Sequence, residues 1–183
     1  QLTTDMRLDA LQAVHNLVSN YEPAKQKAVE HKIISSIARL QRVIDQEEHL
    51  CLAAQTIRAI TLDRELQLAC INDGLMALVT KIAKFELPMI KVNLSAVVYE
   101  LTTIREEYHT TLVSQGIVDI AFWLTLQDCL SANHSIHRCC ARALRNLSLN
   151  EDVALDIVTQ DRLAPILRTL VGSTDLETNL QVT

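Results

Sequence analysis

Glycine, proline and aromatic residues are scarce in this 183-residue sequence, which has three glycines, three prolines and one tryptophan. A β-sandwich or β-barrel needs such residues at its many turns, so their scarcity argues against both fold classes. The phosphate-binding patterns GxGxxG and GxxxxGK[ST] are also absent. Leu and Ala together supply 46 residues, a composition typical of helices. The sequence therefore predicts an all-α protein without nucleotide-binding loops.

The charge and hydropathy of the chain restrict its partners. A net charge of −5 and a pI near 5.7 argue against binding nucleic acid or anionic membranes through the overall field. No apolar run approaches the length of a membrane span, and the first twenty residues lack the apolar region of a signal peptide. We therefore expect no nucleic-acid partner, no direct membrane insertion and a cytoplasmic location, with nuclear, cytoskeletal or ciliary placement left open.

Five cysteines, an odd number, lie mostly in apolar helical stretches, which favours reduced, buried thiols over disulfides. Five potential metal ligands fall within twelve residues: Cys129, His134, His137, Cys139 and Cys140. Their spacing is irregular and lacks a second CxxC or HxxxH pair, so it is a poor match for zinc. We interpret the cluster as buried thiols and loop histidines, and we expect no metal and no cofactor.

Catalytic patterns are missing from the sequence. GxSxG and HExxH do not occur, and the carboxylates gather at expected helix starts, where they complement helix dipoles. We therefore expect that the protein is not an enzyme.

The chain repeats itself about every 42 residues. Four segments share a polar or glycine pivot followed by an apolar stripe, and the pivots lie 42, 42 and 45 residues apart, at Lys32, Gly74, Gly116 and Asp161. An alanine-rich series keeps the same phase, with spacings of 43, 41 and 46 residues between Leu17, Ile60, Leu101 and Leu147. The repeat is therefore the unit of the fold.

Apolar residues recur every three or four positions inside each repeat, which predicts amphipathic helices. Three helices fit each repeat: a short one ending at the pivot (24–30, 65–72), a second starting there (75–84, 117–127) and an alanine-rich third (47–62, 89–103, 135–149). Gly74 and Gly116 can take the left-handed conformation that closes the short helix.

Residues 139–173, CCARALRNLSLNEDVALDIVTQDRLAPILRTLVGS, closely resemble the armadillo repeat, whose third helix reads AAxALxNLS. Asn16 and Asn146 match the family's third-helix asparagine, whereas Ala59 and Glu100 depart from it. The resemblance covers essentially the whole chain and implies a right-handed α-solenoid. Its phase implies a third helix of a preceding repeat at 1–20, complete repeats at 21–62, 63–104 and 105–149, and a partial repeat at 150–183. Because the sequence starts at Gln1 and ends inside this pattern, we expect an excerpt of a longer chain whose neighbouring repeats are missing.

Third helices line a concave groove in this family, so the resemblance implies a protein-binding surface. The predicted contact residues are Gln12 and Asn16, Gln55 and Arg58, Tyr99 and Glu100, and Arg138, Arg142, Arg145 and Asn146. Importin-α-like armadillo proteins carry a tryptophan ladder here, but its positions are occupied by Gln12, Gln55, Ala96 and Arg142. Binding of nuclear localisation signals is therefore not implied. Trp123 lies on a second helix, where we interpret it as core packing beside Phe122 or Leu124.

Arg138, Arg142 and Arg145 share a helical face at i, i+4 and i+7. A β-catenin-like groove would use them to hold an acidic extended or helical segment, because guanidinium groups bind carboxylates at two points. The alternative is a solvated face that suits the carboxylates of Glu151 and Asp152.

The sequence therefore predicts a non-enzymatic scaffold that binds a partner protein along the groove. Two alternatives stay open. The chain would act as a structural spacer in a cytoskeletal, ciliary or membrane-tethered assembly, or as a docking or regulatory region of a larger enzyme.

Overall fold

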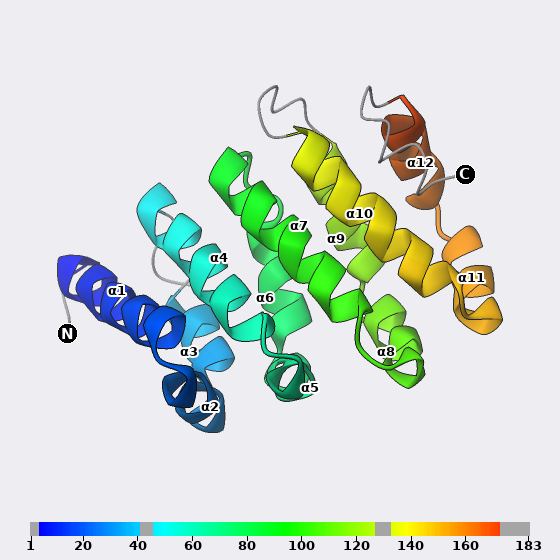
Figure 1. The fold of residues 1–183 in the computed structure, drawn as a ribbon. Coiled ribbons are helices and arrows are strands. Elements are labelled where there is room, and N and C mark those ends of the chain that lie inside the picture. The colour runs from blue at the N-terminus through cyan, green and yellow to red at the C-terminus, as the bar shows by residue number, and fades with distance from the viewer. Residues whose placement is uncertain (1–3, 41–45, 127–132, 173–183) are drawn as a thin grey trace.

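The computed structural model describes residues 4–40, 46–126 and 133–172. These residues form twelve α-helices and one short 3-10 helix, with no strand among them. The helices recur in groups of three along the chain (Figure 1), which confirms the all-α solenoid predicted from composition and repeat.

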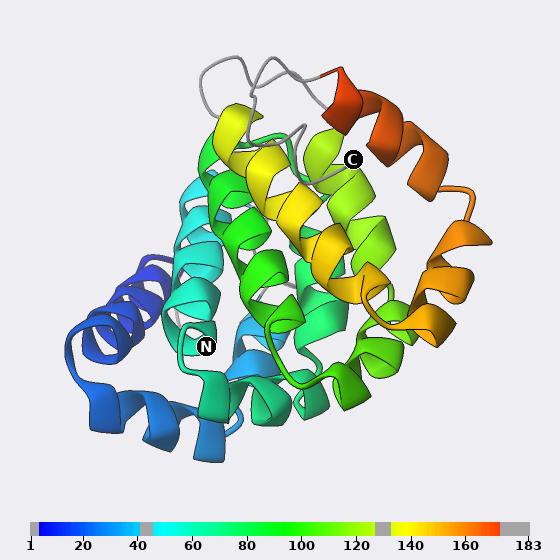
Figure 2. The ribbon, with the colours of Figure 1, turned by 45° about the vertical axis from the view of Figure 1, so that its right-hand side comes forward.

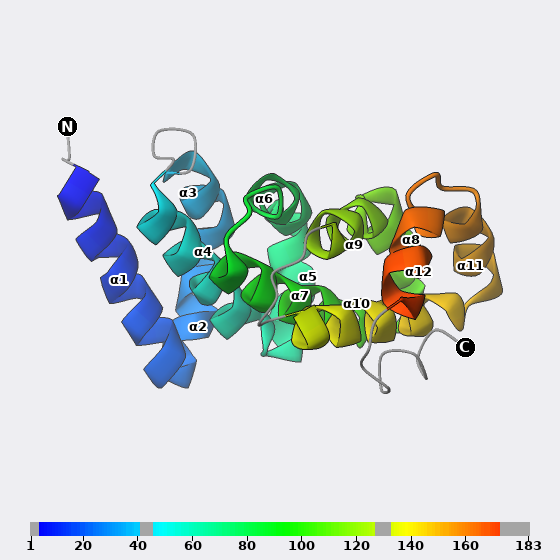
Figure 3. The ribbon, with the colours of Figure 1, turned by 90° about the horizontal axis from the view of Figure 1, so that it is seen from above.

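The alanine-rich third helices lie side by side along one face of the molecule (Figure 1). They are α1 (Thr4–Asn20), α4 (Glu47–Thr61), α7 (Pro88–Thr102) and α10 (Asn133–Ser148). A view from above shows a second layer behind them (Figure 3), formed by α3 (Ile33–Leu40), α6 (Leu75–Ile82), α9 (Ile117–Thr125) and α12 (Leu163–Val171).

The short first helices form the remaining edge, which runs in Figure 2 from the lower left along the bottom and up the right-hand side. They are α2 (Glu22–Glu30), α5 (Arg64–Asn72), α8 (His109–Ser114) and α11 (Glu151–Val158), and the 3-10 helix Glu106–Tyr108 precedes α8. The predicted helix ranges agree with the structure to within a few residues. The sequence did not predict the 3-10 helix, because its three residues show no period.

Three of the four predicted pivots adopt the backbone conformation that the sequence predicts for glycine. Gly74 and Gly116 have φ values of 92° and 91°, in the left-handed region. Lys32 occupies the equivalent pivot with φ 58° and is the non-glycine residue with positive φ in the described part of the chain. Left-handed backbone costs an L-residue about 1–2 kcal/mol, and Lys32 bears this cost. Asp161, the fourth predicted pivot, is not among the described residues with positive φ, so the last repeat turns without this conformation.

The carbonyl groups at the ends of α4 and α7 each have a side-chain partner on the following first helix. Gln67 Nε2 donates to the Thr61 carbonyl oxygen at 2.8 Å, and His109 Nε2 lies 3.1 Å from that of Thr102. All of these side chains are buried. A buried carbonyl oxygen without a hydrogen-bond partner is costly. The side-chain hydrogen bonds avoid this cost, so the chain can leave the helix and turn while its last carbonyl group stays buried.

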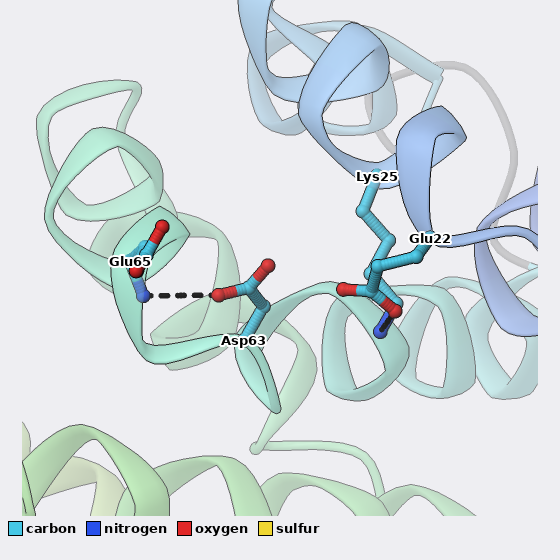
Figure 4. A network of polar contacts seen from close by, with 4 residues as sticks. All are labelled: Glu22, Lys25, Asp63 and Glu65. Atoms are coloured by element: carbon cyan, nitrogen blue, oxygen red, sulfur yellow. Dashed lines mark hydrogen bonds and ion pairs between the residues drawn. The ribbon is translucent and has the colours of Figure 1, made fainter.

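Polar contacts also join neighbouring repeats at the pivots and at the edge formed by the first helices. Ser35 at the start of α3 donates its backbone N–H to Asp73 Oδ2 at 3.1 Å, one residue before the Gly74 pivot. Figure 4 shows Glu22 and Lys25 of α2 facing Asp63, which caps α5 by accepting from the Glu65 backbone N–H at 3.0 Å. The hydrogen bond from Ser35 to Asp73 therefore joins one repeat to the next, while the Asp63 cap stabilises the start of α5 within its own repeat.

None of the helices within the described ranges is long and apolar enough to cross a membrane.

Replacing Gly74 by Ala is expected to lower the free energy of unfolding by about 1 kcal/mol, because the Cβ of an alanine is sterically strained in the left-handed conformation. A Cβ at this position would meet no atom within 4 Å, so the cost is confined to the backbone. Lys32→Gly is the matched control and should raise stability by about 0.5 kcal/mol, after the entropy of an added glycine is deducted. Urea denaturation followed by circular dichroism measures both. Equal stability of Gly74→Ala and the parent chain would contradict the account.

Buried thiols should make the protein less stable at alkaline pH. Burial raises the pKa of Cys70 to about 12 and also raises the pKa of Cys140. In the unfolded chain both thiols lose protons near their ordinary pKa of 9, while the folded chain retains them, so the free energy of unfolding falls as pH rises above about 9. Denaturation midpoints at pH 8 and pH 10.5 measure this. The decline should be smaller in Cys70→Ala, and an equal decline would rule out this cause.

Candidate functional site

The predicted contact residues lie on the exposed side of α1, α4, α7 and α10, which we call the third-helix face. Each third helix contributes to this face two positions that lie four residues apart. They are occupied by Gln12 and Asn16, Gln55 and Ala59, Ala96 and Glu100, and Arg142 and Asn146. The first pair is exposed, and the other six residues are half-buried. Their neighbours on α4 and α7 are largely buried, so these positions form the accessible surface of the row.

Side chains on this face link each third helix to the next. His15 Nδ1 of α1 lies 3.4 Å from Thr56 Oγ1 of α4, and Arg58 Nη1 of α4 donates to Asn93 Oδ1 of α7 at 3.2 Å. The Arg142 guanidinium of α10 stacks over the Tyr99 ring of α7, 5.9 Å from its centroid. Because His15, Arg58 and Tyr99 occupy equivalent positions, the cross-link is a repeated feature.

Two further hydrogen bonds hold the predicted asparagines. Asn146 Nδ2 donates to Thr102 Oγ1 at 3.2 Å, which ties α10 to α7. Gln12 Nε2 donates to Asn16 Oδ1 at 2.9 Å along α1. The amide groups of both asparagines are therefore oriented before any partner arrives.

Two of the three predicted arginines of α10, Arg142 and Arg145, have different surroundings, and the third, Arg138, is half-buried. Arg142 leans toward α7, where it stacks on Tyr99. Arg145 lies on the other side of α10 and lines a hollow shared with α11 and α12. Helical spacing predicts that Arg142 and Arg145 share one face of α10. That face is wide, so Arg142 at one edge contacts α7 while Arg145 at the other edge lies beside α11 and α12.

A hollow of about 400 Å³ opens at the N-terminal half of the third-helix face. His15, Gln55, Arg58 and Asn93 line it, together with Lys25 of α2. Lys25 is also paired with Glu22 at 2.8 Å, which lowers the pKa of Glu22 (Figure 4). Basic side chains from two rows of helices therefore border this hollow.

Cys139 lies near the charged side chains of the face. It is half-buried, and burial raises the pKa of its thiol, while Arg142 and Arg58 lower it and Glu100 raises it. The sequence interpretation of both cysteines as buried thiols therefore holds fully for Cys140, one residue later, and only in part for Cys139. Two arginines and one glutamate therefore lie close enough to the Cys139 thiol to change its pKa.

Within the residues that the structure describes, no three His, Cys, Asp or Glu side chains gather as a metal ion would require. His137 and Cys140 are buried within α10. Cys129, the first member of the predicted cluster, lies outside the described residues.

Trp123 packs partly against the core, as the sequence predicted. Its ring meets that of Phe122 edge to face at 5.5 Å. Lys84 Nζ and the Arg162 guanidinium each lie 5.7 Å from its centroid, and Arg162 also pairs with Asp119 at 3.3 Å. Trp123 therefore joins the second-helix row and is absent from the third-helix face.

No protein-family model and no curated protein matches the sequence. Several solved structures match the fold. One is a designed armadillo repeat protein in complex with the peptide (KR)4, with a TM-score of 0.78 and 16% identity over 100% of this chain and 74% of that one. Another is a computationally designed armadillo repeat protein for modular peptide recognition, with a TM-score of 0.79 and 17% identity over 98% of this chain and 74% of that one.

The stacking of Arg142 on Tyr99 is expected to contribute about 0.5–1 kcal/mol, the usual value for a partly exposed cation–π pair. A double-mutant cycle with Arg142→Ala and Tyr99→Ala, read by urea denaturation, isolates this energy from the loss of each side chain. A parallel cycle with Arg58→Ala and Tyr99→Ala is the control and should give no coupling, because those residues are not paired. Zero coupling in the first cycle would show that the two side chains do not interact.

Proposed function

Because the chain has an armadillo-like repeat fold, we propose that it is a non-enzymatic scaffold that binds an extended segment of a partner protein along the third-helix face. In this proposal the contacts are Gln12, Asn16, Gln55, Arg58, Tyr99, Glu100, Arg138, Arg142, Arg145 and Asn146. Peptide binding by the designed armadillo proteins of the same fold is consistent with this use of the surface.

The observation that carries the proposal is the repeated cross-linking of polar side chains between third helices. Arg58, Arg142 and Asn146 are all held by a neighbouring helix at the solvent boundary. Side chains that are already ordered lose less entropy when a ligand arrives. Since the four equivalent pairs of positions continue along the row, a partner in extended conformation would meet one pair in each repeat, although the side chains differ from pair to pair.

The chemistry of the central repeats favours an acidic partner. Arg58 and Arg142 flank Cys139, with Glu100 as the nearby anion. A guanidinium donates two parallel hydrogen bonds to a carboxylate and keeps its charge when partly desolvated. We therefore propose that Asp or Glu side chains of the partner approach Arg58 and Arg142.

The free thiols support a location in a reducing compartment. Four cysteines of the described residues are free thiols: Cys51, Cys70, Cys139 and Cys140. We propose the cytoplasm as the place where the scaffold acts.

The proposed function is tested with two fluorescein-labelled octapeptides, (Asp-Glu)4 and (Lys-Arg)4, by fluorescence anisotropy at low salt. We expect (Asp-Glu)4 to bind the more tightly and to be displaced by added salt. The double variant Arg58→Glu and Arg142→Glu should weaken its binding by about tenfold or more, because each hydrogen bond to a charged group contributes about 1.5–3 kcal/mol.

Arg105→Glu is the matched charge control, since its side chain is 81% exposed in the loop after α7. It should bind (Asp-Glu)4 within about twofold of the parent chain, because an exposed charge away from the contact contributes little. Equal binding by the double variant and the parent would overturn the site, and tighter binding of (Lys-Arg)4 would overturn the acidic partner.

A further inference from the structure

The small side chain of Ala59 leaves room for the hollow on the N-terminal half of the third-helix face. The equivalent positions of the other third helices carry the longer side chains of Asn16, Glu100 and Asn146. The hollow measures about 400 Å³ and is bordered by residues of α1, α2, α4 and α7. Because α1 and α4 are neighbouring third helices that pack on each other, it lies between two repeats of the solenoid.

Two cationic side chains from different helices border this hollow. Lys25 of α2 and Arg58 of α4 both line it, and no carboxylate of the described residues does. A hydrogen bond to Asn93 of α7, at 3.2 Å, holds the Arg58 guanidinium in place. On α7 the position of Ala59 is taken by Glu100, so the next repeat has an anion of its own there.

Lys25 has no part in the turn that its repeat position serves elsewhere. The equivalent residues, Gln67 and His109, lie within hydrogen-bond distance of the last carbonyl groups of α4 and α7. The Lys25 ammonium instead pairs with Glu22 on its own helix at 2.8 Å (Figure 4), although its side chain is only 14% exposed. Glu22 is 66% exposed, so the partner of this ammonium is a solvated carboxylate that a stronger anion can replace.

His15 and Ser19 of α1 add hydrogen-bonding groups to the same wall. The Thr56 hydroxyl donates to the Leu52 carbonyl oxygen at 2.7 Å, so its oxygen can only accept from His15 Nδ1, 3.4 Å away. His15 Nε2, 3.5 Å from Ser19 Oγ, is therefore the unprotonated nitrogen of the neutral ring. Burial lowers the pKa of His15, whereas a nearby anion raises it and adds an N–H donor at Nε2.

Two cations around one opening suit a single doubly charged group better than a carboxylate. A phosphate monoester carries about −1.5 to −2 charges at pH 7 and has three strong acceptor oxygens. A guanidinium binds two of these oxygens side by side, while an ammonium acts as a point charge. A carboxylate has one charge and would leave one of the two cations uncompensated.

We propose that this hollow binds the phosphate group of a phosphoserine or phosphothreonine in the partner segment. Lys25 and Arg58 pair with the phosphate, and Ser19 and His15 add hydrogen bonds. The inference rests on the proposed function, because the phosphorylated residue belongs to the segment that lies along the third-helix face. Phosphorylation of the partner then strengthens the contact at one repeat.

Three fluorescein-labelled octapeptides test the site by fluorescence anisotropy at constant ionic strength. They alternate Asp and Glu and differ only in the fourth residue, which is phosphoserine, Glu or Ser. The phosphoserine peptide should bind about tenfold more tightly than the Glu peptide, because it gains one hydrogen bond between charged groups. The Ser peptide should bind more weakly than either.

Lys25→Gln introduces the side chain that Gln67 has at the equivalent position, and it should lose most of the preference for phosphoserine. Lys27→Gln is the matched control and should keep the preference. Lys27 also pairs with a glutamate of α2 at 2.8 Å, but it does not line the hollow. Circular dichroism of each variant checks that helix content is unchanged.

Glu22→Gln should tighten binding of the phosphoserine peptide by about threefold, because it removes the carboxylate that competes for Lys25. Glu30→Gln changes the net charge equally and breaks the corresponding pair with Lys27, so it should leave the affinity within about 1.5-fold of the parent chain. A gain in affinity does not arise from a damaged fold, which makes this variant a test independent of Lys25→Gln.

Equal binding of the phosphoserine and Glu peptides to the parent chain overturns the phosphate site and leaves the proposed function in place. Failure of the Glu peptide to bind overturns the proposed function, and binding of the phosphoserine peptide alone still supports the hollow as its site. If neither peptide binds, both proposals fail. Full preference in Lys25→Gln, or equal affinities of Glu22→Gln and Glu30→Gln, contradicts the role of Lys25.

Discussion

The burial of one helical stripe against the preceding third helix is the constraint on which this structure depends. His49, Ala53, Thr56 and Ile60 show the stripe in α4, and it recurs in α7 and α10. A single three-helix repeat is too small to bury its own apolar face, so each repeat is stable only beside its neighbours. The row of parallel third helices follows directly from that requirement.

Stacking divides each third helix into residues that hold the solenoid together and residues that remain available to a partner. Gln55 and Ala59 belong to the second group in α4, while the buried stripe belongs to the first. Cross-links such as Arg58 to Asn93 lie at the boundary, where they stabilise the stack and also orient polar groups toward solvent. Binding capacity is therefore a consequence of the packing geometry.

The two ends differ from the middle for the same reason. Leu17 at one end and Val158 at the other are exposed by more than half, although the repeat pattern gives them apolar side chains. Between the ends, the left-handed pivots give successive repeats the same turn between first and second helix. These pivots are Lys32, Gly74 and Gly116.

The sequence by itself determined the helices, the pivots and the repeat, because these depend on local spacing and on the freedom of glycine at positive φ. It did not separate the surroundings of Arg142 from those of Arg145, and it did not show that Cys139 is half-buried while Cys140 is fully buried. Nor did it show that α1 exposes residues whose equivalents in the other third helices are buried. Those features depend on which helix lies on each side of the residue. Equivalent sequence positions have the same local conformation, but their burial and partners differ, since tertiary structure decides which neighbours are present.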